Sequence, residues 1–244
     1  INRRQPVVER VPEIDSFDLA AKHSGSYRDT VALLRYGPDG TGLDTVGRVP
    51  GMEMSQLPMT FGGQTVSTPS PVPLGKATVT AVGRDRLYLA TNGQWEVEVR
   101  GPDGSVRRII RVRAPAAPIT AAEIAAHKQE QRETLEASPR FRSVPQQFKD
   151  QFLQGIDNAS YPATKPWIAG ITPSPDGALW IEEVGSPGAP RRPVAVLDSG
   201  GRFLGRLNLP VGFRMMAVEP EAVIGVWKDE NDVEHVRVYS IRRP

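Results

Sequence analysis

The chain has 244 residues, of which 39% are hydrophobic and 24% charged, and its formal net charge at pH 7 is +2. No apolar run reaches the roughly 18 residues that a transmembrane helix needs. The absence of cysteine excludes disulfides and thiolate metal sites. Most of the 30 basic residues are arginines that alternate with acidic and apolar residues. Because they are not gathered with aromatic residues, we expect no nucleic-acid binding.

The first part of the chain predicts strands at 6–11, 30–36 and 42–49, the last two joined by a Gly-Pro-Asp-Gly turn at 37–40. The segment 50–75 is rich in proline and methionine and predicts a long loop, either functional or lying over one face of the domain. A second Gly-Pro-Asp-Gly turn separates the last two of four further predicted strands, at 76–82, 86–91, 94–100 and 105–112.

The segment 114–165 interrupts the strands and predicts a helical insertion. Thr120 and Glu123 have the spacing of a capping box, in which each side chain accepts a hydrogen bond from the other residue's backbone N–H. A first helix is expected to follow directly. A second is expected over 145–154, with Gly155 as its stop signal.

The clearest repeat unit lies at 167–209, where turns rich in Pro, Asp, Ser and Gly separate four short strands. Pro175 and Pro220 mark equivalent turns about 45 residues apart, within the period of β-propeller repeats. A partial copy of the unit therefore follows, with strands at 213–218, 222–227 and 233–241.

These units hold three, four, four and three predicted strands, or about three and a half four-stranded blades. We therefore predict an all-β fold with a small helical insertion: residues 1–244 form a single partial β-propeller domain, an incomplete ring, with the insertion at 114–165 between blades. Since an open ring leaves sheet edges exposed, we expect the chain to be the C-terminal part of a longer protein. Unrelated hairpins in a β-sandwich are the alternative.

Four motifs carry a family resemblance: DRLYLATNGQWEVEV at 85–99, ITPSPDGALWIEE at 171–183, VLDSGGRFLGRLNLP at 196–210 and VIGVWKDENDVEHVRVYSI at 223–241. Over roughly 86–242 the chain resembles bacterial six-bladed β-propeller proteins related to NHL repeats. The resemblance implies a location in the periplasm or at the cell surface, whereas the residues alone leave the compartment open.

The second motif is also similar to the repeat of streptogramin lyases, with Trp180 and Glu183 at matching positions. That family repeats the motif in nearly every blade, whereas this chain has it once. The catalytic histidine and metal site of the family have no counterpart in this sequence.

The candidate ligand-binding residues are Trp180, Glu182 and Glu183. The two glutamates follow one another on a predicted strand, so their side chains are expected to point to opposite faces. We assign no catalytic residue, no metal site and no cofactor. The alternative is a divalent cation held by carboxylates that include these two and Asp229.

The three histidines, His23, His127 and His235, lack the spacing of a metal site. His127 is expected to be solvated on the polar face of the first helix. The acidic turn at 229–234 predicts a solvated hairpin in preference to a calcium site, because it lacks the glycine and the acidic spacing of a calcium loop.

No nucleophile elbow, phosphate loop or dinucleotide fingerprint is present. We therefore favour a non-enzymatic binding or scaffold module that acts on a protein or small-molecule ligand through its loops and helical insertion. The alternative is a metal-dependent lyase or lactone hydrolase with a site on the propeller axis. A third possibility places an enzyme site in a preceding part of a longer protein. Three or more Asp, Glu, Asn or His side chains converging at one channel mouth would favour the metal-dependent enzyme.

Overall fold

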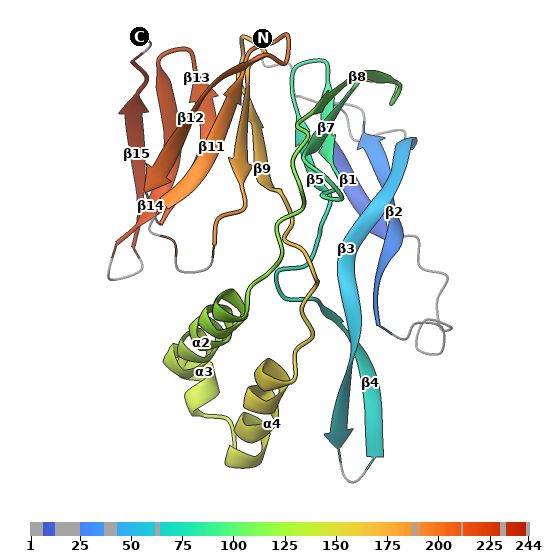
Figure 1. Ribbon diagram of the computed structural model, residues 1–244, viewed down its shortest axis with the longest axis vertical. Coiled ribbons are helices and arrows are strands. Elements are labelled where there is room, and N and C mark those ends of the chain that lie inside the picture. The colour runs from blue at the N-terminus through green and yellow to red at the C-terminus, as the bar shows by residue number, and fades with distance from the viewer. Residues whose placement is uncertain are drawn as a thin grey trace.

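The computed structural model describes residues 7–12, 25–36, 43–61, 64–186, 189, 191–210, 212–229 and 233–242. The fold is mostly β, with four antiparallel sheets that lie side by side in chain order (Figure 1). The first and fourth sheets lie at opposite ends of this row (Figure 1). No helix in the described ranges is both long and apolar enough to cross a membrane.

Each sheet is a meander in which consecutive strands pair. The first sheet contains β1 (Val7–Pro12), β2 (Ser26–Tyr36), β3 (Leu43–Phe61) and β4 (Gln64–Pro71). The second contains β5 (Val79–Val82), β6 (Leu87–Ala90), β7 (Glu96–Arg100) and β8 (Val106–Arg111). The third contains β9 (Ile168–Pro173), β10 (Leu179–Glu183), β11 (Arg191–Leu197) and β12 (Phe203–Pro210). The fourth contains β13 (Phe213–Glu219), β14 (Ala222–Lys228) and β15 (Glu234–Ser240).

Apolar residues on both faces of the inner sheets explain why the sheets stack. On β10, Leu179 and Ile181 pack toward the second sheet, whereas Trp180 between them packs toward the fourth. On β6, Leu89 packs toward the first sheet and Tyr88 toward the third. Because side chains alternate between faces along a strand, a continuous apolar run produces two cores.

The first strands of the last three sheets lie next to one another, since β9 contacts both β5 and β13. At the end of the row, the outer face of the fourth sheet is open to solvent. Val236 is 75% exposed and Val238 63%, although both are apolar residues within a strand. Among the described residues, none gives this face the apolar cover that the two inner sheets have on both faces.

Turns with glycine at positive φ connect the outer strands, as predicted. At 101–104 the backbone N–H of Gly104 donates to the carbonyl of Gly101 at 2.9 Å. Gly104 has φ +79°, and a Cβ atom on it would lie 2.1 Å from the carbonyl oxygen of Val46 in the first sheet. Only glycine fits there, because the turn must also pass close to the neighbouring sheet. The predicted turn at 37–40 lies outside the described residues.

The prediction of a loop over 50–75 is wrong. Residues 50–61 extend β3, and β4 pairs with them from Met54↔Pro71 to Phe61↔Gln64. The first sheet therefore has a fourth strand that the sequence did not predict. The hairpin made by the C-terminal half of β3 and by β4 projects beyond the other sheets (Figure 1).

Helices form within the segment predicted to contain them, between β8 and β9: α2 (Ala121–Ala137), α3 (Pro139–Arg142) and α4 (Gln146–Asp157). The predicted capping box at Thr120 and Glu123 begins α2. The stop predicted at Gly155 is wrong, because α4 continues to Asp157. A glycine costs a helix only about 1 kcal/mol, which neighbouring turns and packing can offset.

The insertion leaves and rejoins the sheets through a narrow neck of two paired segments. The N–H of Lys165 donates to the carbonyl of Ala117 at 2.9 Å, and the N–H of Ile119 donates to that of Ala163 at 3.2 Å. The helices project from the same end of the sheets as the β3–β4 hairpin (Figure 1). These two projections create the site described next.

Candidate functional site

The predicted ligand-binding residues Trp180 and Glu182 lie inside the stack of sheets. Trp180 is 6% exposed, in the core between the third and fourth sheets. Glu182 is 8% exposed, and its Oε2 lies 3.1 Å from Nη1 of Arg192. Burial raises the pKa of Glu182, and the charge of Arg192 opposes this shift.

Glu183 points to the other face of the third sheet, as predicted. Its Oε1 accepts hydrogen bonds from Nε1 of Trp95 and from Nη2 of Arg206, each at 2.9 Å. The two glutamates therefore do not converge on one point. Both contact neighbouring side chains, and a role for them or for Trp180 in ligand binding stays a prediction.

The proposed cation ligand Asp229 is engaged within its own hairpin. Its Oδ1 accepts from the N–H of Val233 at 3.0 Å, and its Oδ2 lies 2.8 Å from Nε2 of His235. His23, Glu230 and Asp232 lie outside the described residues. Within the ranges that the structure describes, no three His, Cys, Asp or Glu side chains are grouped so as to hold a metal ion.

A cleft of about 520 Å³ lies between the β3–β4 hairpin and the helical insertion, and we call it the insert cleft. Its volume is in the range of small-molecule and peptide sites. Both walls carry apolar side chains, among them Leu57, Pro58 and Pro71 on the hairpin and Phe152, Ile156 and Tyr161 on the insertion. No sequence motif predicted this cleft, because its walls come from segments far apart in the chain.

Gln56 in the hairpin wall carries an amide without a partner. Its Nε2 and Oε1 are both buried, and neither has a hydrogen-bond partner among the described residues. Leaving a buried amide unpaired costs about 1–3 kcal/mol, so nearly all such groups in proteins are paired. Other atoms of Gln56 line the insert cleft, whereas the two polar atoms of its amide are shielded from solvent.

Gly155 in the helical wall leaves space that the chain itself does not use. It lies within α4, and a Cβ atom on it would meet nothing within 4 Å. Neither a positive φ nor a close contact requires glycine here, whereas glycine weakens a helix by about 1 kcal/mol relative to alanine. Its effect is to widen the insert cleft.

His127 and Tyr161 form a polar pair at the helical wall. Nδ1 of His127 lies 3.0 Å from the hydroxyl of Tyr161, and the rings meet edge to face with centroids 5.7 Å apart. Burial raises the pKa of the Tyr161 hydroxyl. The prediction that His127 is solvated is thus wrong in part, because the side chain is half-buried and hydrogen-bonded.

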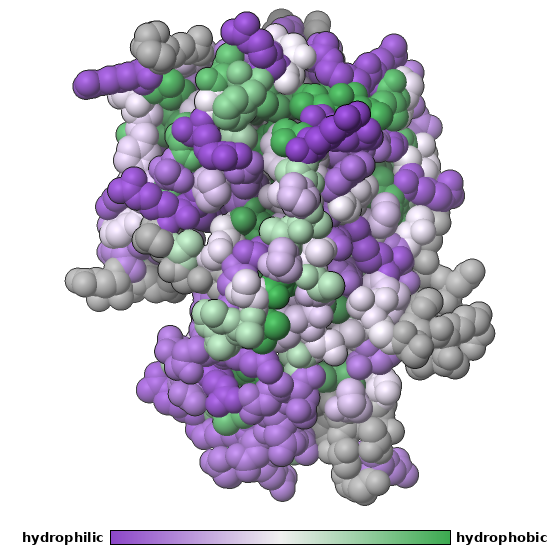
Figure 2. All heavy atoms as spheres, viewed as in Figure 1, coloured by the Kyte–Doolittle hydropathy of each residue, from purple (hydrophilic) through white to green (hydrophobic). Residues whose placement is uncertain are grey.

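Charged groups around the insertion are paired with one another. Asp157 binds Arg132 through its carboxylate and Lys128 through its backbone carbonyl. Figure 2 shows that hydrophilic residues cover the outer surface of the insertion. These charges lie on the surface and do not line the insert cleft.

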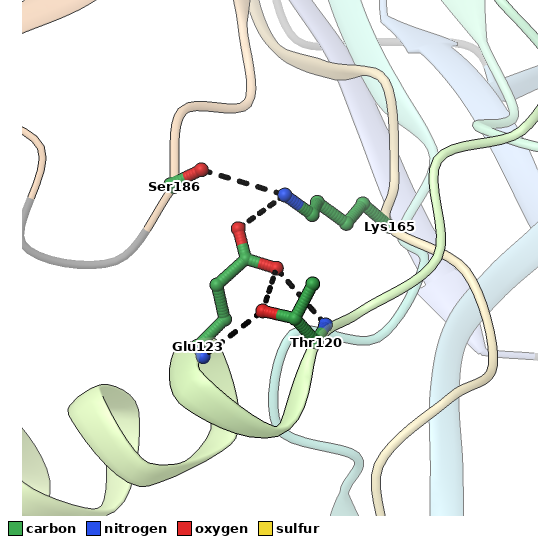
Figure 3. A network of polar contacts seen from close by, with 4 residues as sticks. All are labelled: Thr120, Glu123, Lys165 and Ser186. Carbon is green, nitrogen blue, oxygen red and sulfur yellow. Dashed lines mark hydrogen bonds and ion pairs between the residues drawn. The ribbon is translucent and has the colours of Figure 1, made fainter.

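A second polar network ties the insertion to the third sheet (Figure 3). Lys165 contacts the carboxylate of Glu123, and its Nζ lies 3.4 Å from Oγ of Ser186. The carboxylate of Glu123 also accepts from the backbone N–H of Thr120 at 3.0 Å. These contacts, led by the one with Lys165, lower the pKa of Glu123 to about 2. The network fixes the position of α2 relative to the sheets.

Comparison with known proteins adds no family to this picture. A scan against models of protein families finds no match, and no curated protein matches the sequence. The function must therefore be argued from the insert cleft itself.

Proposed function

We propose that the chain is a non-enzymatic binding module that takes its ligand into the insert cleft. The observation that carries the proposal is the insert cleft itself, about 520 Å³ in volume, with apolar side chains on both of its walls. The open position beside Gly155 supports the same conclusion independently.

We further propose that the four sheets are blades of one open, partial β-propeller spanning residues 1–244, with the insertion at 114–165 between blades. Three observations support this: sequential meanders, apolar cores between successive sheets, and adjacent first strands. The exposed outer face of the fourth sheet supports an open arc. In such a fold, a rigid stack holds projecting segments at one end, where they can bind.

A fragment titration tests the binding proposal. Neutral fragment mixtures are added to ¹⁵N-labelled protein, and the backbone amide resonances are followed. We expect at least one mixture to shift the resonances of Gln56, Gly155 and their neighbours. Gly155→Trp should abolish these shifts, because its side chain fills the free space of the cleft.

Gly205→Trp is the matched control, since a Cβ atom on Gly205 of β12 also meets nothing within 4 Å and this residue lies outside the cleft. It should bind like the wild type. Shifts that cluster elsewhere, or that survive in Gly155→Trp, would contradict the proposal.

A further inference from the structure

We infer that the outer face of the fourth sheet is a dimer contact, which packs against the same face of a second copy of the chain. We call this surface the end face, and its apolar centre consists of Ile224, Val226, Val236 and Val238. The fourth sheet lies at one end of the row of sheets (Figure 1). The inference goes beyond the proposed binding function and does not depend on the insert cleft.

A short motif recurs on the third strand of each of the last three sheets. It is Val-x-Val, at 97–99 on β7, 194–196 on β11 and 236–238 on β15. The second valine of each motif pairs with an apolar residue on the second strand of its sheet, namely Tyr88, Trp180 and Ile224 in turn. The three motifs are therefore equivalent positions of one repeated sheet, and their valines point away from the preceding sheet.

The next sheet in the row covers the first two copies of the motif. Val97 and Val99 lie in the core that the second sheet shares with the third, and Val194 lies in the core between the third and fourth. These three valines are at most 4% exposed, whereas Val236 is 75% exposed and Val238 63%. Since an antiparallel sheet covers both buried copies, the cover that fits the third copy is another antiparallel sheet, packed about 10 Å away.

The charges at the two ends of the end face favour a second copy as that sheet. Arg214 and Glu219 of β13 are both exposed, and their partners on β14 are Val226 and Ala222. A bulge in β13 lies between them, so both point to the end face in spite of their odd spacing. When two end faces meet with their strands antiparallel, Arg214 of each copy lies over Glu219 of the other. A twofold axis therefore makes the face complementary to itself.

The end face is small for a dimer contact. Each of its three strands has seven residues, so it spans roughly 15 by 24 Å at the usual strand spacing and rise. Contacts of this size lie at the lower limit of specific interfaces. We therefore expect a reversible dimer with a dissociation constant of about 10–100 µM.

Pairing along the edge of β15 is a poorer explanation. β15 is an edge strand of the described sheet. A strand added there continues the sheet sideways and leaves Val236 and Val238 uncovered. Burial of exposed apolar side chains is the main force that favours association, so the contact is assigned to the face.

Sedimentation of the full chain tests the contact, at concentrations from about 5 to about 500 µM. We expect a monomer–dimer equilibrium. Val238→Thr keeps the shape of the side chain and the backbone groups of β15 but adds a hydroxyl group, which the dimer would bury. It should weaken the dimer at least about tenfold, because both copies carry the change. Val106→Thr on β8 is the matched control, since Val106 is 50% exposed and lies in the second sheet, and it should dimerise like the wild type.

Arg214→Glu and Glu219→Arg test the orientation of the two copies. Each variant alone places like charges over one another and should weaken the dimer. An equal mixture of the two should restore association, because the copies then carry opposite charges at the facing positions. Energy transfer between the two variants, each with its own fluorescent label, measures this mixed dimer.

Three results would overturn the inference. One is a chain that stays monomeric up to about 500 µM. Another is a dimer that survives Val238→Thr, which would assign the contact to a different surface, such as the edge of β15. The third is a mixture of the charge variants that associates no better than either one alone. Gly155→Trp should leave the dimer unchanged, so failure of the dimer and failure of binding in the insert cleft are distinguishable.

Discussion

The stacked sheets and the insert cleft differ in whether a buried side-chain amide is hydrogen-bonded. In the sheets, the amide of Asn92 is 2% exposed, and it donates to the carbonyls of Ala77 and Ile168 at 2.9 Å each. Its oxygen accepts from the N–H groups of Trp167 and Ile168. In the cleft, the amide of Gln56 has no partner within the described structure. The comparison shows that the buried amide of the stack is fully paired, whereas the buried amide in the cleft wall is not.

The largest difference in stability loss is expected between alanine substitutions at two phenylalanines. Phe213 is fully buried between the third and fourth sheets and meets Tyr239 edge to face, so Phe213→Ala should lower the free energy of unfolding by about 3–5 kcal/mol. Phe152→Ala in the cleft should cost about 1 kcal/mol or less, because the ring is half exposed. Urea unfolding measures both, and equal losses would break the comparison.

The next effect concerns the paired amide. Asn92→Ala leaves two carbonyls and two N–H groups without their partner, and should cost about 2–4 kcal/mol. Hydrogen exchange should accelerate at Trp167 and Ile168 in particular. Asn208→Ala on β12 is the control and should stay within about 0.5 kcal/mol of the wild type, because Asn208 is exposed. Similar losses for both variants would show that Asn92 does not anchor the return of the insertion.

Two glutamates, one in the third sheet and one in the insertion, should make the free energy of unfolding change with pH in opposite directions. The pKa of Glu182 is raised by burial, so its ionisation opposes folding, and stability should fall as pH rises from about 4.5 through this raised pKa. The pKa of Glu123 is lowered to about 2, so its contribution is present above about pH 4.5 and is lost as pH falls toward 2.

Unfolding free energies measured across this pH range test both signs. Glu182→Gln should remove the decline at higher pH, and Glu123→Gln should remove the decline in acid. Glu219→Gln, at an exposed strand end, is the control and should leave both trends in place. A loss of both trends in either single variant would show that the two regions are not independent.

The smallest expected effect is a gain in stability. Gly155→Ala should stabilise the protein by about 0.5–1 kcal/mol, because alanine favours the helix and its methyl group meets free space. In a chain of this size the melting temperature should rise by about 1–4 °C. A destabilised variant would mean that space beside Gly155 is needed for folding and not for a ligand.

The regular sheets were predictable because their signals are local. The strands of the fourth sheet were expected at 213–218, 222–227 and 233–241, and they form at Phe213–Glu219, Ala222–Lys228 and Glu234–Ser240. Turn residues bound each of them, and apolar residues dominate the first two. The capping box of α2 was predictable for the same reason. Each of these features depends on residues only a few positions apart.

The candidate site was not predictable, because its features depend on distant contacts. The β3–β4 hairpin contains Pro58 and Pro69, which argue against strands unless the edge position of β4 is known. From the sequence alone, Gly155 predicts the end of a helix, whereas in the structure α4 continues past it to Asp157. The insert cleft exists only once the hairpin and the insertion are placed together.

Because of its paired neck, the insertion can be deleted without displacing the chain on either side of it. Because the backbones of Ala117 and Lys165 are already hydrogen-bonded to one another, replacing the residues between them with a short turn leaves both ends of the cut where they now lie. The remaining stack keeps its apolar cores, because no residue of the three core clusters lies between 117 and 165. The same junction could accept a foreign helical hairpin of equal span, so the scaffold can be regrafted with a new wall opposite the hairpin.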